Sequence, residues 1–344
     1  MVVLAKGELE QIALPAAVQK AAPPLADVPE VDLGGGGARV DAARAVVAAC
    51  EGHGFFKVTG HGVPAGLLAR VEAAAAAFFA MTQPEKEAAG AVATAPGSPF
   101  GYGSKRIGSN GDLGWVEYLL LGVTAAAPAP LPAHGEASPS YSSFRDILNE
   151  YVVVVRAMIC EVLKLMAEGL GLKEKDAFVR LASHEESDSM LRVNHYPPHP
   201  EFKQQGHGRL TGFGEHTDPQ IISVLRSNDT SGLEISLRDG SWASVPPDRK
   251  SFFVNVGDVL QVLTNGRFRS VRHRVMVSSP RPRVSVIFFA GPPPRERLAP
   301  LPWLVVEDGG RRRYREFTWR EYKASAYRTK LAENRLCHFE TEAD

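Results

Sequence analysis

The side chains of this chain most able to do chemistry are two histidines and one aspartate. His216 and Asp218 are separated by a single residue, and His273 follows much later. Two imidazoles and one carboxylate can form a facial set of three metal ligands. Such a set leaves half of an octahedron open and is found in non-haem Fe(II) oxygenases. The pattern therefore predicts an iron centre with room for a second molecule to bind.

The alternation of side chains along β-strands predicts that the three ligands converge. Side chains two positions apart in a strand point to the same face, so His216 and Asp218 are expected to share one. His273 shares its face with Val271 and Val275, whereas its immediate neighbours are arginines. We therefore expect His273 to point inward, among aliphatic side chains.

An arginine follows on the next β-like segment. Arg283 and Ser285 alternate with valines and share a face with Ile287 and Phe289. An arginine that points into an apolar core is costly unless an opposite charge meets it, and no acid in the neighbouring segments is an obvious partner. A bound dicarboxylate would supply that charge, bidentate to the guanidinium, with Ser285 adding a hydrogen bond.

The same alternation places Asn194 and Tyr196 on one face, together with Arg192. Tyr196 is predicted to reach the far end of the bound dicarboxylate, the co-substrate. Asn194 is predicted to reach an oxygen near the metal. The alternative is that Tyr196 only packs its ring. Each motif is weak by itself, since His-x-Asp pairs are common on surfaces. Their combination, in this order and on consecutive β-like segments, is specific.

The elements that must position these residues change in character near Met190. Beyond it, short runs rich in β-branched and aromatic residues are separated by turns. These runs cover 190–196, 211–218, 220–226, 233–238, 251–256, 268–277 and 283–290. Asp239-Gly240 and Asn265-Gly266 are typical turn pairs. The pattern predicts a double-sheet jelly roll.

Before this region the hydrophobic spacing is helical. It predicts helices over 39–50, 64–80 and 143–171, with short strands near 28–33 and 54–62 and a proline-rich loop over 123–140. We expect a mainly β protein with α: a loose arm (1–27), a mostly helical region (28–185), the β-core (186–295) and a C-terminal tail (296–344) with a helix over about 318–331.

Bulk composition argues against several classes of protein. The 39 basic and 39 acidic residues balance, so no net charge draws the chain to nucleic acid or to anionic membrane. The three cysteines are far apart, which disfavours a disulfide framework. No apolar run approaches a membrane span and no signal peptide is recognised. A cytoplasmic protein is expected, and a homo-oligomer is left open.

At these residues the chain resembles the plant 2-oxoglutarate- and Fe(II)-dependent dioxygenases, over about 28–330. The resemblance is carried by residues 54–63, 194–198, 214–219, 255–258, 263–266 and 273–275. Within that family, the block over 100–120 is similar to that of the gibberellin 2-oxidases acting on C19 gibberellins. One departure is His199, where relatives often have cysteine, and it lies outside the predicted metal set.

The resemblance implies a distorted double-stranded β-helix (jelly roll) core with flanking helices. The implied Fe(II) ligands are His216, Asp218 and His273. The implied 2-oxoglutarate residues are Arg283 and Ser285, assisted by Tyr196 and Asn194. The implied reaction uses O2, with ascorbate in support, for 2β-hydroxylation of a bioactive gibberellin, which inactivates the hormone.

The implied substrate is a rigid, mostly apolar diterpenoid with a carboxylate, so we expect apolar pocket walls with few polar groups. Arg106 and Tyr102 are the predicted partners of that carboxylate. For Arg106 the alternative is a surface ion pair. Two other functions stay open at this point. One is the same chemistry on another hormone, a flavonoid or an alkaloid. The other is a ligand-binding protein without catalysis on the same fold.

Overall fold

The computed structural model describes residues 22–90, 100–107, 111–123, 139–198, 209–277 and 279–341. Most of the predicted N-terminal arm, nearly all of the predicted loop over 123–140 and the departure at His199 lie outside these ranges. Where the arm is described, Leu25 forms a parallel bridge with Ser244. The division of the chain at residue 186 stays a prediction.

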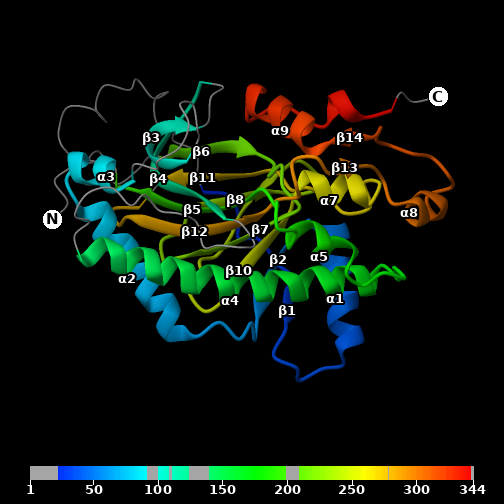
Figure 1. Cartoon of the computed structure of the whole chain (residues 1–344), viewed down its shortest axis with the longest axis horizontal. Helices are drawn as coiled ribbons and strands as arrows, with labels where there is room; N and C mark the ends of the chain where they lie inside the picture. The colour runs from blue at the N-terminus through cyan, green and yellow to red at the C-terminus, as the bar shows by residue number, and fades with distance from the viewer. Residues whose placement is uncertain are drawn as a thin grey trace.

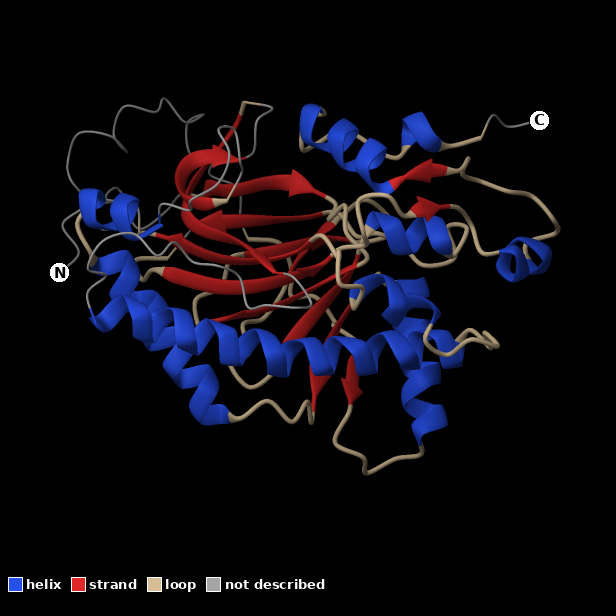
Figure 2. Ribbon diagram, in the orientation of Figure 1, coloured by secondary structure: helices blue, strands red, loops and turns tan. Residues whose placement is uncertain are grey.

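Two β-sheets form the centre of the molecule (Figures 1 and 2). Within the described ranges the larger sheet has eight strands in the order β1-β2-β10-β7-β12-β5-β4-β3, and the smaller has four in the order β6-β11-β8-β9. The larger sheet comprises β1 (Glu30–Asp32), β2 (Phe55–Thr59), β3 (Gly101–Ile107), β4 (Asp112–Val123), β5 (Ser189–Tyr196), β7 (Ile222–Ser227), β10 (Phe252–Val256) and β12 (Arg283–Ala290). The smaller comprises β6 (Leu210–His216), β8 (Leu233–Ser236), β9 (Trp242–Ser244) and β11 (His273–Val277). The region predicted to be mostly helical thus contributes four strands to the larger sheet.

Each β-rich run predicted beyond Met190 contains a strand, and two of the differences in boundary affect the metal-ligand candidates. The run predicted over 211–218 ends as a strand at His216, so Asp218 lies just beyond the strand. Pro219 has no backbone N–H with which to continue a ladder. The run predicted over 268–277 becomes a strand only at His273. Both metal-ligand histidines therefore lie at strand ends, where the chain is free to turn toward the cavity.

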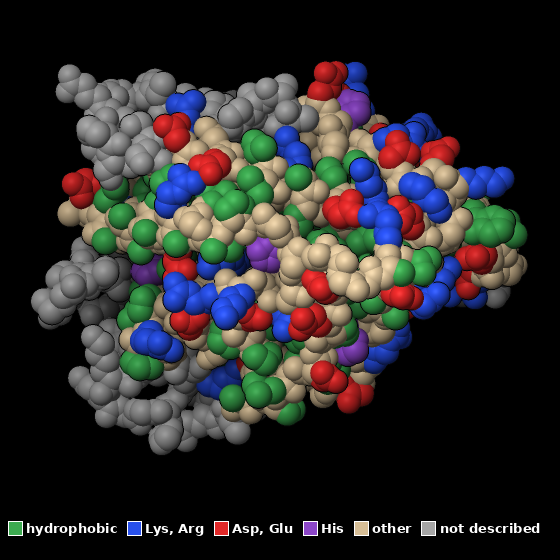
Figure 3. Space-filling model, turned by 90° about the horizontal axis from the view of Figure 1, so that it is seen from below, with side chains coloured by type: hydrophobic (Ala, Val, Ile, Leu, Met, Phe, Trp, Pro, Cys, Tyr) green, Lys and Arg blue, Asp and Glu red, His purple; other side chains and the backbone are tan. Residues whose placement is uncertain are grey.

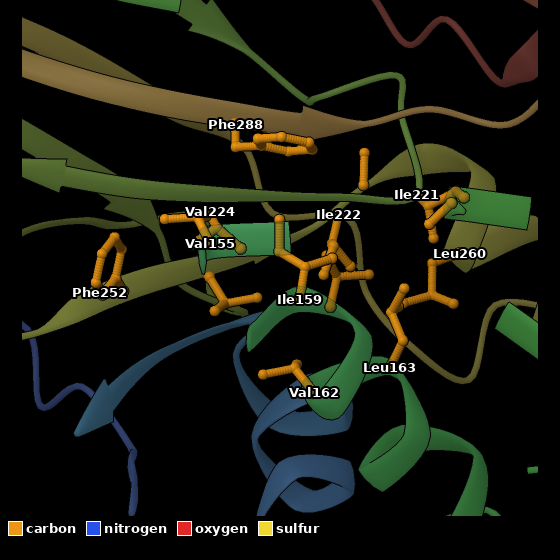
Figure 4. Packing of buried hydrophobic residues seen from close by; sticks show 14 of the residues in the cluster. Val155, Ile159, Val162, Leu163, Ile221, Ile222, Val224, Phe252, Leu260 and Phe288 are labelled. Atoms are coloured by element: carbon orange, nitrogen blue, oxygen red, sulfur yellow. The ribbon is translucent and has the colours of Figure 1, made fainter. Parts of the chain in front are cut away.

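Helices cover the outer face of the larger sheet (Figure 2). They are α1 (Arg39–Gly52), α2 (Ala65–Ala80) and the long α4 (Pro139–Gly169). The apolar side chains that recur at helical spacing along α4 are buried: Val155, Met158, Val162, Leu165 and Met166. In Figure 4, Val155 and Ile159 of α4 lie beneath Ile222 and Val224 of β7. Burial of each such side chain contributes about 1.5–3 kcal/mol to the stability of the fold. This packing fixes the larger sheet against α4.

Shorter helices complete the fold: α3 (Gln83–Gly90), α5 (Ala177–Ala182), α7 (Asp258–Leu263), α8 (Pro302–Glu307) and α9 (Trp319–Arg328). A two-stranded sheet of β13 (Arg297–Leu298) and β14 (Phe317–Thr318) precedes α9. Thr318 and Glu321 form a capping box at the start of α9. The Trp319 indole donates to Asp188 at 2.7 Å, so the C-terminal tail is tied to the start of β5.

A second apolar cluster fills the space between the two sheets. It combines Phe55, Leu225 and Ile287 of the larger sheet with Phe213 and Ile235 of the smaller.

On the face seen in Figure 3, basic and acidic side chains are interspersed. No helix among the described residues is long and apolar enough to cross a membrane.

Candidate active site

The two histidines and the aspartate meet at one end of the smaller sheet. His216 and His273 are directly paired in the antiparallel ladder of β6 and β11, and their ring centroids are 4.3 Å apart. The Oδ1 atom of Asp218 is 3.6 Å from Nε2 of His216 and 3.7 Å from Nε2 of His273. One ligand atom of each residue thus lies within 4.8 Å of the other two.

Backbone carbonyls fix the orientation of both rings. Nδ1 of His216 lies 2.8 Å from the carbonyl oxygen of Gly214, and Nδ1 of His273 lies 3.2 Å from that of Val271. A ring N–H donated to a carbonyl leaves the other nitrogen of a neutral imidazole free to bind metal. Both Nε2 atoms are therefore presented to the same point.

The aspartate is held in a similar way. Its Oδ2 accepts hydrogen bonds from the Ser223 hydroxyl and from Nδ2 of Asn255, the latter at 3.1 Å. The backbone N–H of Asp258, at the start of α7, donates to the carbonyl of Asp218 at 2.8 Å. These contacts occupy one carboxylate oxygen and leave Oδ1 facing the histidines.

The protonation states suit a divalent cation. Burial, followed by the proximity of His273, lowers the pKa of His216 to about 4. Burial alone would raise the pKa of Asp218, but the two imidazoles and the Ser223 hydroxyl hold it well below its usual range. Near neutral pH the site therefore offers a neutral imidazole at His216 and an ionised carboxylate, as metal binding requires. This donor set fits Fe(II).

A second group of polar side chains lies in the same cavity, on the larger sheet. Arg283 and Ser285 of β12 pair in register with Tyr196 and Asn194 of β5. All four line the cavity together with the three metal-ligand candidates. The predicted convergence of these two groups is therefore present in the structure.

Among the described residues, Arg283 has no acidic partner. It is buried, and its Nε has no hydrogen-bond partner among the described residues. Burial lowers the pKa of its guanidinium. The guanidinium carbon lies 5.5 Å from the ring centroid of Tyr196, a contact that compensates only a small part of the cost of burying a charge. An anion bound beside Arg283 would supply the rest.

The cavity walls between these polar groups are apolar. Phe213, Leu225, Leu233, Ile287 and Phe289 contribute to the lining from both sheets. Apolar walls with a few convergent polar groups are typical of sites that bind small molecules.

The two predicted substrate residues lie elsewhere. Arg106 is exposed on β3. The hydroxyl of Tyr102 donates to Oε2 of Glu117 at 2.6 Å, within a buried cluster that includes Lys86 and His195. Neither Arg106 nor Tyr102 lines the cavity that holds the metal-ligand candidates. Their role in binding a substrate carboxylate stays a prediction.

Sequence reasoning missed the residues that support Asp218. Ser223 and Asn255 are buried polar positions within the apolar strands β7 and β10. That contrast was the available signal, because a polar group in an apolar strand needs a partner. Which partner it finds depends on how the strands are stacked.

Comparison with known families accounts for most of the chain. Residues 187–292 match the model of the 2OG-Fe(II) oxygenase superfamily, and residues 28–140 match that of the non-haem dioxygenase N-terminal region. The crystal structure of JOX2 in complex with 2OG, Fe and JA is 29% identical, with a TM-score of 0.77, and 95% of this chain and 93% of that chain are covered. The rice dioxygenase for auxin oxidation is 31% identical with a TM-score of 0.75, over 92% of this chain and 100% of that one.

The fold and the site together define a 2-oxoglutarate- and Fe(II)-dependent dioxygenase on a double-stranded β-helix, which confirms the predicted fold class, Fe(II) and 2-oxoglutarate. The gibberellin 2-beta-dioxygenase 1 of Pisum sativum is 53% identical over 91% of this chain and 90% of its own length. The gibberellin 2-beta-dioxygenase of Phaseolus coccineus is 50% identical over 100% of this chain and 99% of its own. The chain belongs to the gibberellin 2-beta-dioxygenase family.

Proposed function

We propose that the protein hydroxylates C19 gibberellins at the 2β position and thereby inactivates the hormone. The observation that carries the proposal is the cavity that the triad of His216, Asp218 and His273 shares with the buried Arg283, which pairs with no acid in the described part of the chain. Support for the substrate comes from the gibberellin 2-beta-dioxygenases to which the chain is similar. The similarity extends over nearly the whole chain. A location in the cytoplasm and a homo-oligomeric state remain predictions.

In this proposal each group of residues has one task. His216, Asp218 and His273 hold Fe(II), and Arg283 and Ser285 hold the distal carboxylate of 2-oxoglutarate. Tyr196 and Asn194 stand beside that carboxylate on β5. When bound, Fe(II) and 2-oxoglutarate supply O2-dependent hydroxylation of an unactivated C–H bond, with conversion of 2-oxoglutarate to succinate.

The chain itself supplies orientation and the exclusion of water. The backbone carbonyls behind both histidines fix the ring directions, and Ser223 and Asn255 fix the carboxylate. Reacting groups held in one geometry gain effective concentration. The apolar walls keep the space beside the triad dry, so that polar interactions there are strong.

A panel of gibberellins tests the proposal directly. The protein with Fe(II) and 2-oxoglutarate is expected to convert C19 gibberellins to 2β-hydroxylated products, with one succinate formed per product. Turnover of another hormone or of a flavonoid, but not of gibberellins, would assign the same chemistry to a different substrate. Absence of succinate release with every substrate would indicate a binding protein without catalysis.

The predicted role of Arg106 has its own test. If Arg106 binds the substrate carboxylate, Arg106→Ala is expected to raise KM for the gibberellin by at least about 10-fold, since a charge-assisted hydrogen bond contributes about 1.5–3 kcal/mol. The affinity for 2-oxoglutarate should not change. Steady-state kinetics with each ligand varied in turn measures both constants. An equal loss for both ligands would refute the assignment.

A further inference from the structure

Arg192 is a second arginine of the active-site cavity to which the proposed chemistry gives no task. It lies on β5, on the same face as Asn194 and Tyr196, and lines the cavity with the metal-ligand candidates. In the β5–β12 ladder it pairs with Ile287, whereas Arg283 pairs with Tyr196. Four positions along a strand correspond to about 13 Å, so the two arginines lie toward opposite ends of the cavity.

The contacts of Arg192 orient its guanidinium but do not neutralise it. Its Nε donates to Oδ1 of Asn194 at 2.8 Å. The guanidinium carbon lies 3.8 Å from the ring centroid of Tyr118 and 5.1 Å from that of Phe213. The two rings hold the plane of the group by cation–π contact. One terminal nitrogen, Nη2, is buried and has no hydrogen-bond partner among the described residues.

Three other arginines that pack against the sheets have acidic partners. Arg274 and Arg209 both pair with the buried Glu234, and Arg226 lies 3.5 Å from Glu72. Within the part of the chain that the structure describes, Arg192 forms no ion pair with an acid. Burial without a partner lowers the pKa of its guanidinium. Since burial of an uncompensated charge is costly, Arg192 is placed to receive an anion from outside the chain.

The co-substrate does not supply that anion. 2-Oxoglutarate has two carboxylates: in the proposed function one is assigned to Arg283, and the other would be held at the metal site. No third carboxylate remains for the far end of the cavity. The other molecule that enters it is the organic substrate, a diterpenoid with a carboxylate under the proposed function.

We propose that Arg192 binds the carboxylate of the organic substrate and selects acidic diterpenoids over their neutral counterparts. The proposal rests on the proposed function and names the residue that recognises the acid. Nη2 and the neighbouring terminal nitrogen are the donors left for a carboxylate, because Nε is already committed to Asn194. Asn194 links this position to Tyr196, to which its Nδ2 donates at 3.3 Å. Arg192 is thus a substrate-binding residue, distinct from those that hold iron and 2-oxoglutarate.

The test compares a C19 gibberellin with its methyl ester, which lacks the negative charge and is larger by one methyl group. Binding of each is measured by calorimetry to protein loaded with Mn(II) and 2-oxoglutarate, and KM by succinate release with Fe(II). The wild-type protein is expected to favour the acid by at least about 30-fold, the usual cost of leaving one partner of a buried charge pair unpaired. Arg192→Met should bind acid and ester equally and keep its affinity for 2-oxoglutarate.

Three further variants make the result decisive. Arg192→Lys keeps the charge but not the bidentate geometry, so an intermediate preference is expected, and it substitutes for Arg192→Met if that variant fails to fold. Arg274→Met removes an arginine that also lies over an aromatic ring, that of Trp242 at 3.9 Å, but lies outside the cavity lining, and should retain the full preference. Arg106→Met tests the competing assignment of this carboxylate to Arg106, because the Arg192 proposal requires that this variant retain the preference.

Retention of the acid preference in Arg192→Met, or its loss in Arg106→Met, would overturn the proposal. A parallel loss of 2-oxoglutarate affinity in folded Arg192→Met would overturn it as well, because the residue would then serve the co-substrate. Failure of the proposed function gives a different result: the wild-type protein would neither bind nor convert the gibberellin or its ester. Measurements on the wild-type protein alone detect this outcome.

Discussion

Asp218→Asn is expected to abolish Fe(II)-dependent turnover and to weaken Fe(II) binding by more than about 100-fold. Loss of a residue that only hydrogen-bonds to a metal ligand costs about 10- to 100-fold, and loss of the ligand itself should cost more. The substitution removes the one negative charge of the triad. It also misdirects the new amide: Nδ2 of Asn255 donates to this position at 3.1 Å, so the amide oxygen turns toward Asn255. The amide NH2 group then points at the metal position, where it cannot act as a ligand. Fe(II) titration under anaerobic conditions and succinate release measure the two effects.

Ser223→Ala is the matched control. It removes a hydroxyl that donates to Oδ2 of Asp218 but leaves the carboxylate and both histidines in place. The expected loss is the smaller one, about 10- to 100-fold in Fe(II) affinity or activity. Wild-type Fe(II) affinity in Asp218→Asn, or a larger defect in Ser223→Ala than in Asp218→Asn, would show that the aspartate is not a ligand.

The metal set could be predicted from the sequence because it depends on local geometry. Residues two apart in or near a strand stay on one side of the chain, so His216 and Asp218 are brought together almost regardless of the rest of the fold. The inward direction of His273 followed from its aliphatic neighbours at the same alternation. The case of Arg283 was similar, since an arginine on an apolar face with no nearby acid predicts an external anion.

What the sequence did not reveal depends on contacts between segments far apart in the chain. The hydroxyl of Tyr102 donates to Glu117, a contact that follows from the pairing of β3 with β4 and that the sequence did not reveal. The predicted role of Tyr102 in binding a substrate carboxylate stays a prediction. Asp258 begins α7 and accepts hydrogen bonds from Tyr322 in the C-terminal helix and from Thr217 beside the metal-ligand candidates. No local pattern specifies such partners, because they follow from the stacking of whole elements.

Arg283→Met is expected to raise KM for 2-oxoglutarate by at least about 30-fold, since truncation of one partner of a buried charge pair costs about 2–5 kcal/mol. The free energy of unfolding of the ligand-free protein should stay the same or rise, because this buried guanidinium has no acidic partner among the residues that the structure describes. Steady-state kinetics measures the first effect and denaturant unfolding the second. Opposite directions in affinity and stability distinguish a binding residue from a structural one.

Unfolding in the presence of 2-oxoglutarate and Mn(II) sharpens the comparison. A ligand at 100 times its Kd stabilises the native state by about 2.7 kcal/mol, so the wild-type protein should gain stability that Arg283→Met does not gain at the same concentration. Ser285→Ala removes a single hydroxyl from the same strand and should lose only about 10- to 100-fold in affinity, the range expected for one hydrogen bond to a charged group. If Arg283→Met instead unfolds more readily and keeps the wild-type response to 2-oxoglutarate, the arginine supports the β5–β12 ladder and the co-substrate carboxylate lies elsewhere in the cavity.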